Sequence, residues 1–214
     1  MAGEPIRGEN RMNMRAAKQD RNAADDVLDR SDPRWERLRQ IILDKSLKLG
    51  DFILSSGRTS KYLFQLRQTT LLPEGASLLG DVVLEYMKRE NIRCVGGLEL
   101  GAVPLVAAIS AMSHVRGHPV QTFFVRKKAK EHGARERIDG HLTDGENVLL
   151  VDDVATSGNS MFGAVEGIHL EYPNCVVKRA LVVIDRQEGA TEALAARNIQ
   201  LVSIFKKSDF PIPA

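Results

Sequence analysis

From residue 92 onward, short apolar runs alternate with amphipathic segments along the chain. The apolar runs predict buried strands at 92–98, 120–125, 148–151, 175–184 and 199–205. The segments between them predict helices at 103–112, 159–170 and 191–197. Strands that alternate with helices are typical of a parallel sheet covered on both faces. The pattern therefore predicts an α/β fold with a central, mainly parallel sheet flanked by helices.

The pattern before residue 92 is less regular. Asp32 and Pro33 suit the N-cap and first position of a helix, and apolar residues follow at helical spacing. Residues 61–70 alternate loosely and predict a strand, and Pro73 opens a predicted helix that runs to about Glu90. Residues 127–143 are polar without apolar periodicity, so we expect a loop there.

Residues 1–33 differ from the rest of the chain. They carry six basic and seven acidic side chains and no aromatic residue. Such a segment buries too little apolar surface to offset the entropy lost on ordering. We therefore expect a mobile N-terminal tail over 1–33 and one domain over 34–214.

Composition narrows the class of protein. A chain of 214 residues, 43% of them hydrophobic, suits one α/β domain with a real core. A net charge of +2 argues against nucleic acid as a partner. Neither a secretory signal nor a run of about 20 apolar residues is present, so no membrane partner is expected. Cys94 and Cys175 stand 81 positions apart, which favours two buried free thiols and a cytoplasmic location.

The segment Val148–Ser160 carries the clearest chemistry. Four apolar residues are followed by Asp152 and Asp153, and then by a hydroxyl-rich turn that leads into a predicted helix. Ligands of open α/β sheets bind at the carboxyl ends of the strands. A helix start offers unpaired N–H groups to a phosphate, while the two carboxylates suit sugar hydroxyls or a magnesium shell. The segment therefore predicts a site for a phosphorylated sugar.

Positive charge is concentrated in one loop. Residues 126–137 contain six Lys or Arg and two Glu, a local net charge of +4, and Gly133 and Gly140 suit hinges. A cationic lid of this kind is well matched to a pyrophosphate leaving group.

The Val148–Ser160 segment resembles the signature of type I phosphoribosyltransferases for 5-phosphoribosyl 1-pyrophosphate (PRPP). The resemblance implies that fold, with a small N-terminal hood and a cationic lid loop. It implies that Asp152 and Asp153 contact the ribose hydroxyls and that Thr156 to Ser160 hold the 5′-phosphate. Mg²⁺ would enter with PRPP, with help from the two acids but no certain direct protein ligand. The full PRPP set is Asp152, Asp153, Val154, Ala155, Thr156, Ser157, Gly158, Asn159 and Ser160.

The loop pattern R-K-x-x-K-x-H-G resembles the catalytic loop of the orotate phosphoribosyltransferases. By that resemblance, Arg126, Lys127, Lys130 and His132 contact pyrophosphate oxygens. In the family this loop closes over the neighbouring subunit's site, so a homodimer with a shared lid is implied.

Further segments resemble the same family. Leu54–Tyr62 matches its S-G-x-x-S segment near the base, Gly96–Pro104 matches its pyrophosphate loop, and Ile184–Glu188 matches its D-R-Q-E segment. The resemblance implies that orotate is held by Arg186, Thr156 and Phe64.

The chain also departs from the family pattern at two positions. Ser55 and Leu100 stand where some members of the family have Lys.

The resemblance implies transfer of the phosphoribosyl group from PRPP to orotate, giving orotidine 5′-monophosphate and pyrophosphate in pyrimidine synthesis. Two alternatives stay open from the residues. One is the same transfer to another base, and the other is a non-catalytic PRPP-binding regulator on the same fold.

Overall fold

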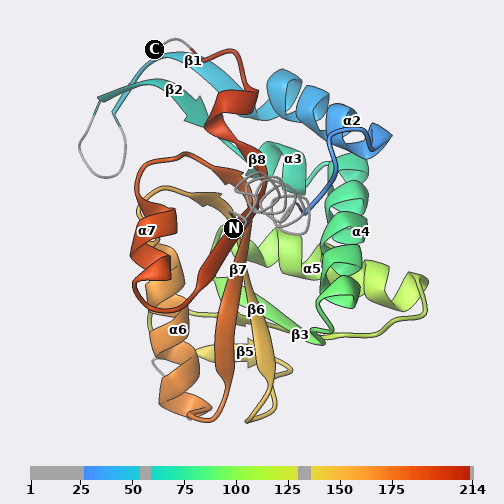
Figure 1. Ribbon diagram of the computed structural model, residues 1–214, viewed down its shortest axis with the longest axis vertical. Coiled ribbons are helices and arrows are strands. Elements are labelled where there is room, and N and C mark those ends of the chain that lie inside the picture. Colours follow the sequence, from blue (N-terminus) through green and yellow to red (C-terminus); the bar gives the residue numbers. More distant parts are fainter. Residues whose placement is uncertain (1–26, 54–58, 130–135, 213–214) are drawn as a thin grey trace, which may run out of the picture.

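A six-stranded sheet forms the centre of the computed structural model, which describes residues 27–53, 59–129 and 136–212 (Figure 1). The strand order is β5-β4-β3-β6-β7-β8. All neighbours are parallel except β5, which pairs antiparallel with β4. The strands are β3 (Cys94–Leu98), β4 (Gln121–Val125), β5 (Ile138–Gly140), β6 (Asn147–Ala155), β7 (Val176–Asp185) and β8 (Gln200–Lys206). The mainly parallel sheet predicted from the sequence is confirmed.

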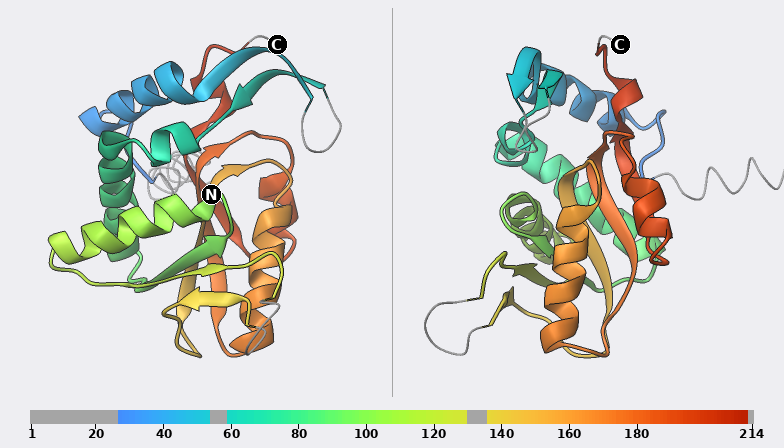
Figure 2. Two further views of the ribbon diagram at one scale, coloured as in Figure 1. Left: turned by 180° about the vertical axis from the view of Figure 1, so that it is seen from behind. Right: turned by 90° about the vertical axis from the view of Figure 1, so that its left-hand side faces the viewer.

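Helices cover both faces of this sheet, as Figures 1 and 2 show. They are α4 (Pro73–Arg89) and α5 (Ala102–Val115) on one face, and α6 (Asn159–Glu171) and α7 (Ala190–Ala195) on the other. Successive residues of β7 serve the two faces alternately: Leu181 packs in the core with α4 and α5, and Val182 packs in the core with α6 and α7. The predicted two-sided cover is therefore present.

The N-terminal hood lies above the carboxyl ends of the strands (Figure 1). It contains α2 (Pro33–Ile41), the π-helical turn η1 (Ile42–Ser46), strands β1 (Leu47–Ile53) and β2 (Thr59–Phe64), and the short helix α3 (Arg67–Thr70). Strands β1 and β2 form a separate antiparallel pair. Aromatic contacts join the hood to the end of the chain: Trp35 lies 5.2 Å from Phe205, and Phe64 lies 5.2 Å from Phe210, between ring centroids.

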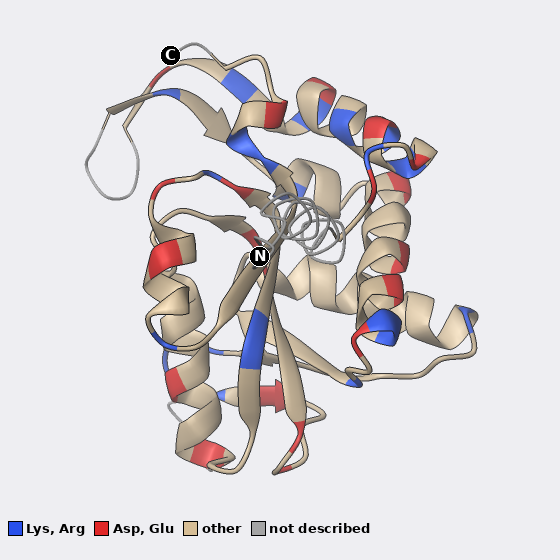
Figure 3. Ribbon diagram, viewed as in Figure 1, with Lys and Arg blue, Asp and Glu red and all other residues tan. Residues whose placement is uncertain are grey.

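Ion pairs tie the helices of the hood to those of the sheet. Arg37 of α2 pairs with Glu74 of α4 at 2.6 Å, and Arg34 of α2 pairs with Glu85 of α4 at 2.8 Å. Figure 3 shows both signs of charge interspersed along α2 and α4. Exposed pairs of this kind contribute little individually, ~0.2–1 kcal/mol each, so the apolar contacts described above supply most of the attachment.

Local predictions at the start of the domain are partly confirmed. The Asp32 carboxylate accepts the Arg34 N–H at 2.8 Å, as expected of an N-cap before Pro33. The predicted strand over 61–70 is wrong in its second half, because β2 ends at Phe64 and 67–70 form α3.

The predicted polar loop over 127–143 also needs correction. It contains the edge strand β5, whose three residues are too few to show a hydrophobic period. β5 is held by its antiparallel pairing with β4, a contact that the local sequence pattern does not reveal.

The predicted tail boundary at residue 33 is wrong for residues 27–33. Val27 and Leu28 are buried in the core with α4 and α5, and the Arg30 guanidinium lies 5.4 Å from the Trp35 ring centroid. Two apolar residues within a charged segment are too weak a signal to separate packing from disorder. Residues 1–26 of the predicted tail lie outside the described residues.

Both cysteines are free and buried, as predicted. Burial raises the pKa of the Cys94 thiol to about 12, so it stays protonated at neutral pH. None of the helices in the described ranges is long and apolar enough to cross a bilayer.

Candidate active site

The acid pair, Asp152 and Asp153, lies within the last four residues of the central strand β6, and not after the strand as predicted. β6 continues to Ala155, four residues beyond the predicted end at Val151. The Asp153 N–H donates to Asp152 Oδ1 at 2.9 Å, and the Val154 N–H donates to Asp153 Oδ1 at 2.8 Å. These bonds orient both carboxylates at the carboxyl end of the sheet. Sequence patterning ended the strand too early because acidic residues are rare inside strands.

Burial makes this pair costly to ionise. Asp152 is 6% exposed. Burial, and then the neighbouring Asp153 charge, raises the pKa of the Asp152 carboxyl well above its ordinary value. Burial also raises the pKa of Asp153, while hydrogen bonds and Arg67 oppose the shift. Two buried carboxyl groups with raised pKa values suit a ligand that brings hydroxyl donors or a cation.

The turn after β6 forms a small cradle at the start of α6. Gly158 precedes the helix with a φ of +83°, a left-handed conformation that favours glycine. A pocket of about 70 Å³ is lined by this turn, and it contains every member of the predicted PRPP set except Asp153. Backbone N–H groups at a helix start suit an anion the size of a phosphate.

The loop after β3 approaches the acid pair closely. A Cβ on Gly101 would lie 2.5 Å from Asp152 Oδ1 and 2.7 Å from Asp153 Oδ1, so a side chain there would displace the two carboxylates. The neighbouring Leu100 side chain is 56% exposed. The predicted pyrophosphate loop is thereby brought against the predicted ribose site.

The described ends of the basic loop are anchored to the sheet. Arg126 pairs with Asp139 of β5 at 2.5 Å, and the Lys127 N–H donates to Glu99 Oε1 at 2.8 Å. Arg137 donates to the Arg126 carbonyl at 3.0 Å, which closes the base of the loop. Lys130 and His132, two of the predicted catalytic residues, lie outside the described residues.

Arg186 stands beside the cradle, directly after the strand next to the acid pair. Its backbone N–H donates to the Ala155 carbonyl at 3.0 Å, and the residue is buried, with 7% of its surface exposed. The guanidinium contacts Tyr62 and Glu188, which the sequence did not single out as site residues. The sequence could have pointed to both residues, because Tyr62 lies in the matched segment Leu54–Tyr62 and Glu188 lies in the matched segment Ile184–Glu188.

Phe64, the third residue predicted to hold the base, packs between the hood and the end of the chain. It is 9% exposed, and its ring meets Tyr62 and Phe210 edge-on at centroid distances of 5.6 and 5.2 Å. Ser55, one of the departures from the family pattern, lies outside the described residues.

The donor set at this site suits a hard cation shared with a ligand. Within the described ranges, no three His, Cys, Asp or Glu side chains gather into a group that could hold a metal ion. The two carboxylates of Asp152 and Asp153 provide oxygen donors, which Mg²⁺ prefers, and phosphate oxygens commonly complete its shell. The residues present therefore fit a Mg²⁺ that arrives with a phosphorylated substrate.

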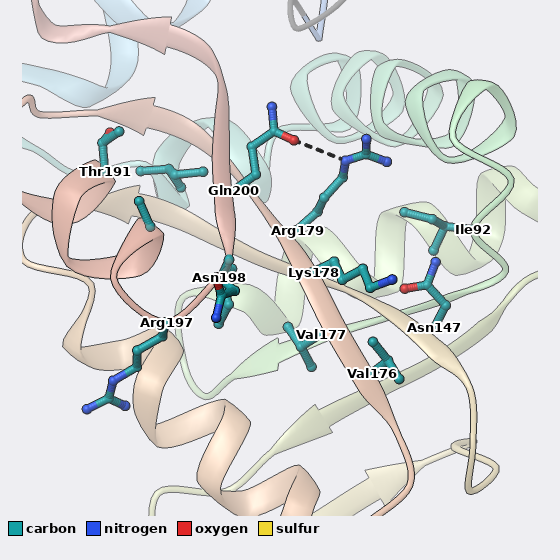
Figure 4. A pocket seen from close by; sticks show the side chains of 13 residues that line it. Ile92, Asn147, Val176, Val177, Lys178, Arg179, Thr191, Arg197, Asn198 and Gln200 are labelled. Carbon is teal, nitrogen blue, oxygen red and sulfur yellow. Dashed lines mark hydrogen bonds between the residues drawn. The ribbon is translucent and has the colours of Figure 1, made fainter.

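A larger pocket, about 920 Å³ in volume, lies at the opposite end of the sheet (Figure 4). Its lining includes the first residues of three parallel strands, Asn147, Val176 and Gln200. Arg179, which also lines it, already donates to Gln200 and pairs with Glu90. Although the cradle is the smaller of the two pockets, we place the active site there. The reason is that α/β sheets bind ligands at the carboxyl ends of their strands.

The comparisons with known proteins agree with this geometry. The Phosphoribosyl transferase domain family matches residues 67–208, which include the acid pair, the cradle and Arg186. The fold and the site thus define a phosphoribosyltransferase.

Curated relatives narrow the class further. The orotate phosphoribosyltransferases of Rhodopseudomonas palustris and Aquifex aeolicus are 43% and 40% identical to this chain over 81% of its length, covering 94% and 96% of their own. The solved Mycobacterium tuberculosis orotate phosphoribosyltransferase is 34% identical with a TM-score of 0.73, covering 84% of this chain and all of that one. The chain belongs to the orotate phosphoribosyltransferase family.

Proposed function

We propose that this protein transfers the 5-phosphoribosyl group from PRPP to orotate, giving orotidine 5′-monophosphate and pyrophosphate in pyrimidine synthesis. The observation that carries the proposal is the hydrogen bond between Arg186 and Ala155. This backbone bond, from the Arg186 N–H to the Ala155 carbonyl, holds Arg186 beside the cradle for a sugar phosphate. The buried Arg186 guanidinium is suited to a carboxylate-bearing base. A Mycobacterium tuberculosis relative, 32% identical with a TM-score of 0.68, has been solved in complex with PRPP, which supports this sugar substrate.

The reaction is a substitution at the anomeric carbon. The orotate ring nitrogen forms the new C–N bond and loses its proton, while the C–O bond to pyrophosphate breaks and pyrophosphate leaves with that electron pair. Asp152 and Asp153 accept hydrogen bonds from the ribose hydroxyls, and Thr156 to Ser160 donate to the 5′-phosphate. The protein's contribution is to position the two substrates and to stabilise the charge that develops between them.

The cationic loop stabilises the departing pyrophosphate in this proposal. Arg126, Lys127, Lys130 and His132 supply the positive charge, and the loop closes over the site of the other subunit of a homodimer. Mg²⁺, when bound, would neutralise charge on the pyrophosphate oxygens. It would arrive with PRPP, and Asp152 and Asp153 would help to hold it. Two buried free thiols support a cytoplasmic location.

A panel of acceptor bases tests the proposal. With PRPP and Mg²⁺, we expect turnover with orotate and none with uracil, adenine or hypoxanthine. Turnover is measured by the loss of orotate absorbance or by the release of pyrophosphate. Turnover with a purine alone would reassign the base. PRPP binding by calorimetry without any turnover would identify a regulator. Lys130→Ala separates these outcomes, because it slows an enzyme sharply and leaves PRPP sensing intact.

A further inference from the structure

The buried Arg186 side chain is held by a closed triangle of hydrogen bonds. Its Nε–H lies 3.0 Å from the Tyr62 hydroxyl oxygen and 3.0 Å from Glu188 Oε1. Its Nη2 lies 2.9 Å from the same Glu188 oxygen. The Tyr62 hydroxyl in turn donates to Glu188 Oε1 at 3.0 Å. Two side chains, one from strand β2 of the hood and one from the loop between β7 and α7, thus fix one guanidinium.

The triangle leaves one edge of the guanidinium for a ligand. A guanidinium carries five N–H groups in a planar fork. Within the described part of the chain, the hydrogen bonds of the Arg186 side chain lie on its Nε side, at Nε and Nη2. The Nη1–Nη2 edge is the end of the fork, distinct from the Nε–Nη2 edge that contacts Tyr62 and Glu188. The Nη1–Nη2 edge has the spacing to bind a carboxylate through two parallel hydrogen bonds.

Tyr62 links this arrangement to the hood. It belongs to β2, which lies above the carboxyl ends of β7 and β8 in Figure 1. Its ring centroid lies 4.6 Å from the Arg186 Cζ and 5.0 Å from the Lys207 Nζ. Burial raises the pKa of the Tyr62 phenol, so its hydroxyl stays protonated and keeps donating to Glu188. The position of Arg186 therefore depends on the hood as well as on the sheet.

We propose that Glu188, supported by Tyr62, is a positioning residue for base recognition that turns the free edge of Arg186 toward the carboxylate of the acceptor base. The proposal rests on the proposed function and extends it to the residues that set specificity. Glu188 neutralises a buried cation that would otherwise rotate toward water. It acts through Arg186 and does not touch the substrate itself.

The test is a steady-state comparison of Glu188→Gln with wild type. We expect the KM for orotate to rise about tenfold, the range for losing a charged hydrogen-bond partner. We expect kcat and the KM for PRPP to stay within about twofold, because the reacting atoms and the cradle are unchanged. Glu192→Gln on α7 is the matched control, since Glu192 is exposed and outside this triangle. It should leave all three constants unchanged.

A double-mutant cycle separates positioning from a general effect on folding. In an Arg186→Ala background, Glu188→Gln should add no further rise in the KM for orotate. Tyr62→Phe removes only one hydroxyl and should raise the KM for orotate about threefold. If Glu188→Gln fails to fold, this variant carries the test alone.

The outcomes keep the two proposals distinct. A wild-type protein that binds PRPP and does not turn over orotate removes the proposed function. An active wild type with an unchanged KM for orotate in Glu188→Gln overturns the positioning role alone. A lower KM in that variant also overturns it, since Glu188 would then compete with the substrate carboxylate for Arg186.

Discussion

At the scale of single residues, the acid pair sets function against stability. The raised pKa of Asp152 means that its charged form is disfavoured in the folded protein. Folding therefore loses stability as the pH rises above the ordinary carboxyl value, and the loss is complete above the raised pKa. Asp152→Asn removes this loss. We expect it to stabilise the ligand-free protein at pH 7 by about 1 kcal/mol or more, or ~2–4 °C in Tm, and to abolish turnover.

Thermal unfolding across pH measures this prediction. The gain in Tm should shrink as the pH falls toward about 4, because both proteins are then uncharged at position 152. Asp144→Asn is a control of opposite sign. Its hydrogen bonds with Asn174 lower the pKa of the Asp144 carboxyl, so this substitution should lower the Tm at neutral pH. A Tm for Asp152→Asn below that of wild type at pH 7 would contradict the argument.

Gly101 offers a second prediction at this scale. An added methyl group would overlap both carboxylates, at 2.5 Å and 2.7 Å. We expect Gly101→Ala to lower stability by about 1–3 kcal/mol through overpacking and to reduce kcat/KM for PRPP by at least about tenfold. Gly163→Ala in α6 is the matched control, because its new methyl group would meet Leu98 at an ordinary 3.7 Å. Equal activity of the two variants would show that the close approach has no role.

The grouping of the acid pair and the following turn at the carboxyl end of the sheet was predictable from the sequence, and the contacts of Arg186 were not. Asp152, Asp153 and the turn to Ser160 predicted a sugar-phosphate site because their types and order match its chemistry. Tyr62 and Glu188 carried only the weaker signal of lying in the matched Leu54–Tyr62 and Ile184–Glu188 segments, since a tyrosine in a strand and a glutamate in a loop are ordinary. Their meeting on Arg186 depends on the hood lying over the sheet, a contact between residues 124 positions apart.

At the scale of elements, the turn from β6 to α6 combines a left-handed backbone conformation at Gly158 with the lining of the phosphate cradle. Gly158 has a φ of +83°, and an alanine Cβ would have room, with Leu194 Cγ 3.5 Å away. Gly158→Ala should therefore cost about 1–2 kcal/mol through its backbone alone. Because the turn carries the phosphate cradle, we expect the KM for PRPP to rise more than the KM for orotate, measured by steady-state kinetics.

Gly145 provides a matched control for that variant. It has a φ of +86°, an added methyl group there would meet nothing within 4 Å, and it precedes β6 at the opposite end of the strand. Gly145→Ala should lower the Tm by a similar amount and leave both KM values unchanged. A rise in the KM for PRPP in both variants would mean that stability, not the cradle, controls binding.

Element boundaries were predicted well where a hydrophobic period was long. The helix predicted from Pro73 to Glu90 is observed over Pro73–Arg89, since seventeen residues establish the period. Two of the shortest elements were missed. α3 has four residues and β5 has three, too few for a helical or strand period to be recognised. Both are held by tertiary contacts, which no local pattern contains.

At the scale of the whole molecule, the first described residues belong to the domain. Val27 and Leu28 are buried in the core shared with α4 and α5, and Arg30 pairs with Asp209 near the end of the chain. Each buried apolar side chain contributes about 1.5–3 kcal/mol relative to an exposed one. Residues 27–32 therefore join the two ends of the fold, and a domain boundary at residue 33 would remove this contact.

Two truncated chains test that boundary. A chain that starts at residue 33 should have a Tm at least about 6 °C below that of a chain starting at residue 27, because losing two buried apolar side chains costs ~3–6 kcal/mol and each kcal/mol shifts the Tm of a domain of this size by ~2–4 °C. Val27→Ala with Leu28→Ala in the longer chain should reproduce most of the loss, because the lost apolar burial is its cause. Turnover of orotate at 25 °C should persist in all three, since none of the changed residues touches the acid pair, the cradle or Arg186. Equal Tm values for the two truncated chains would place the start of the folded domain at residue 33 after all.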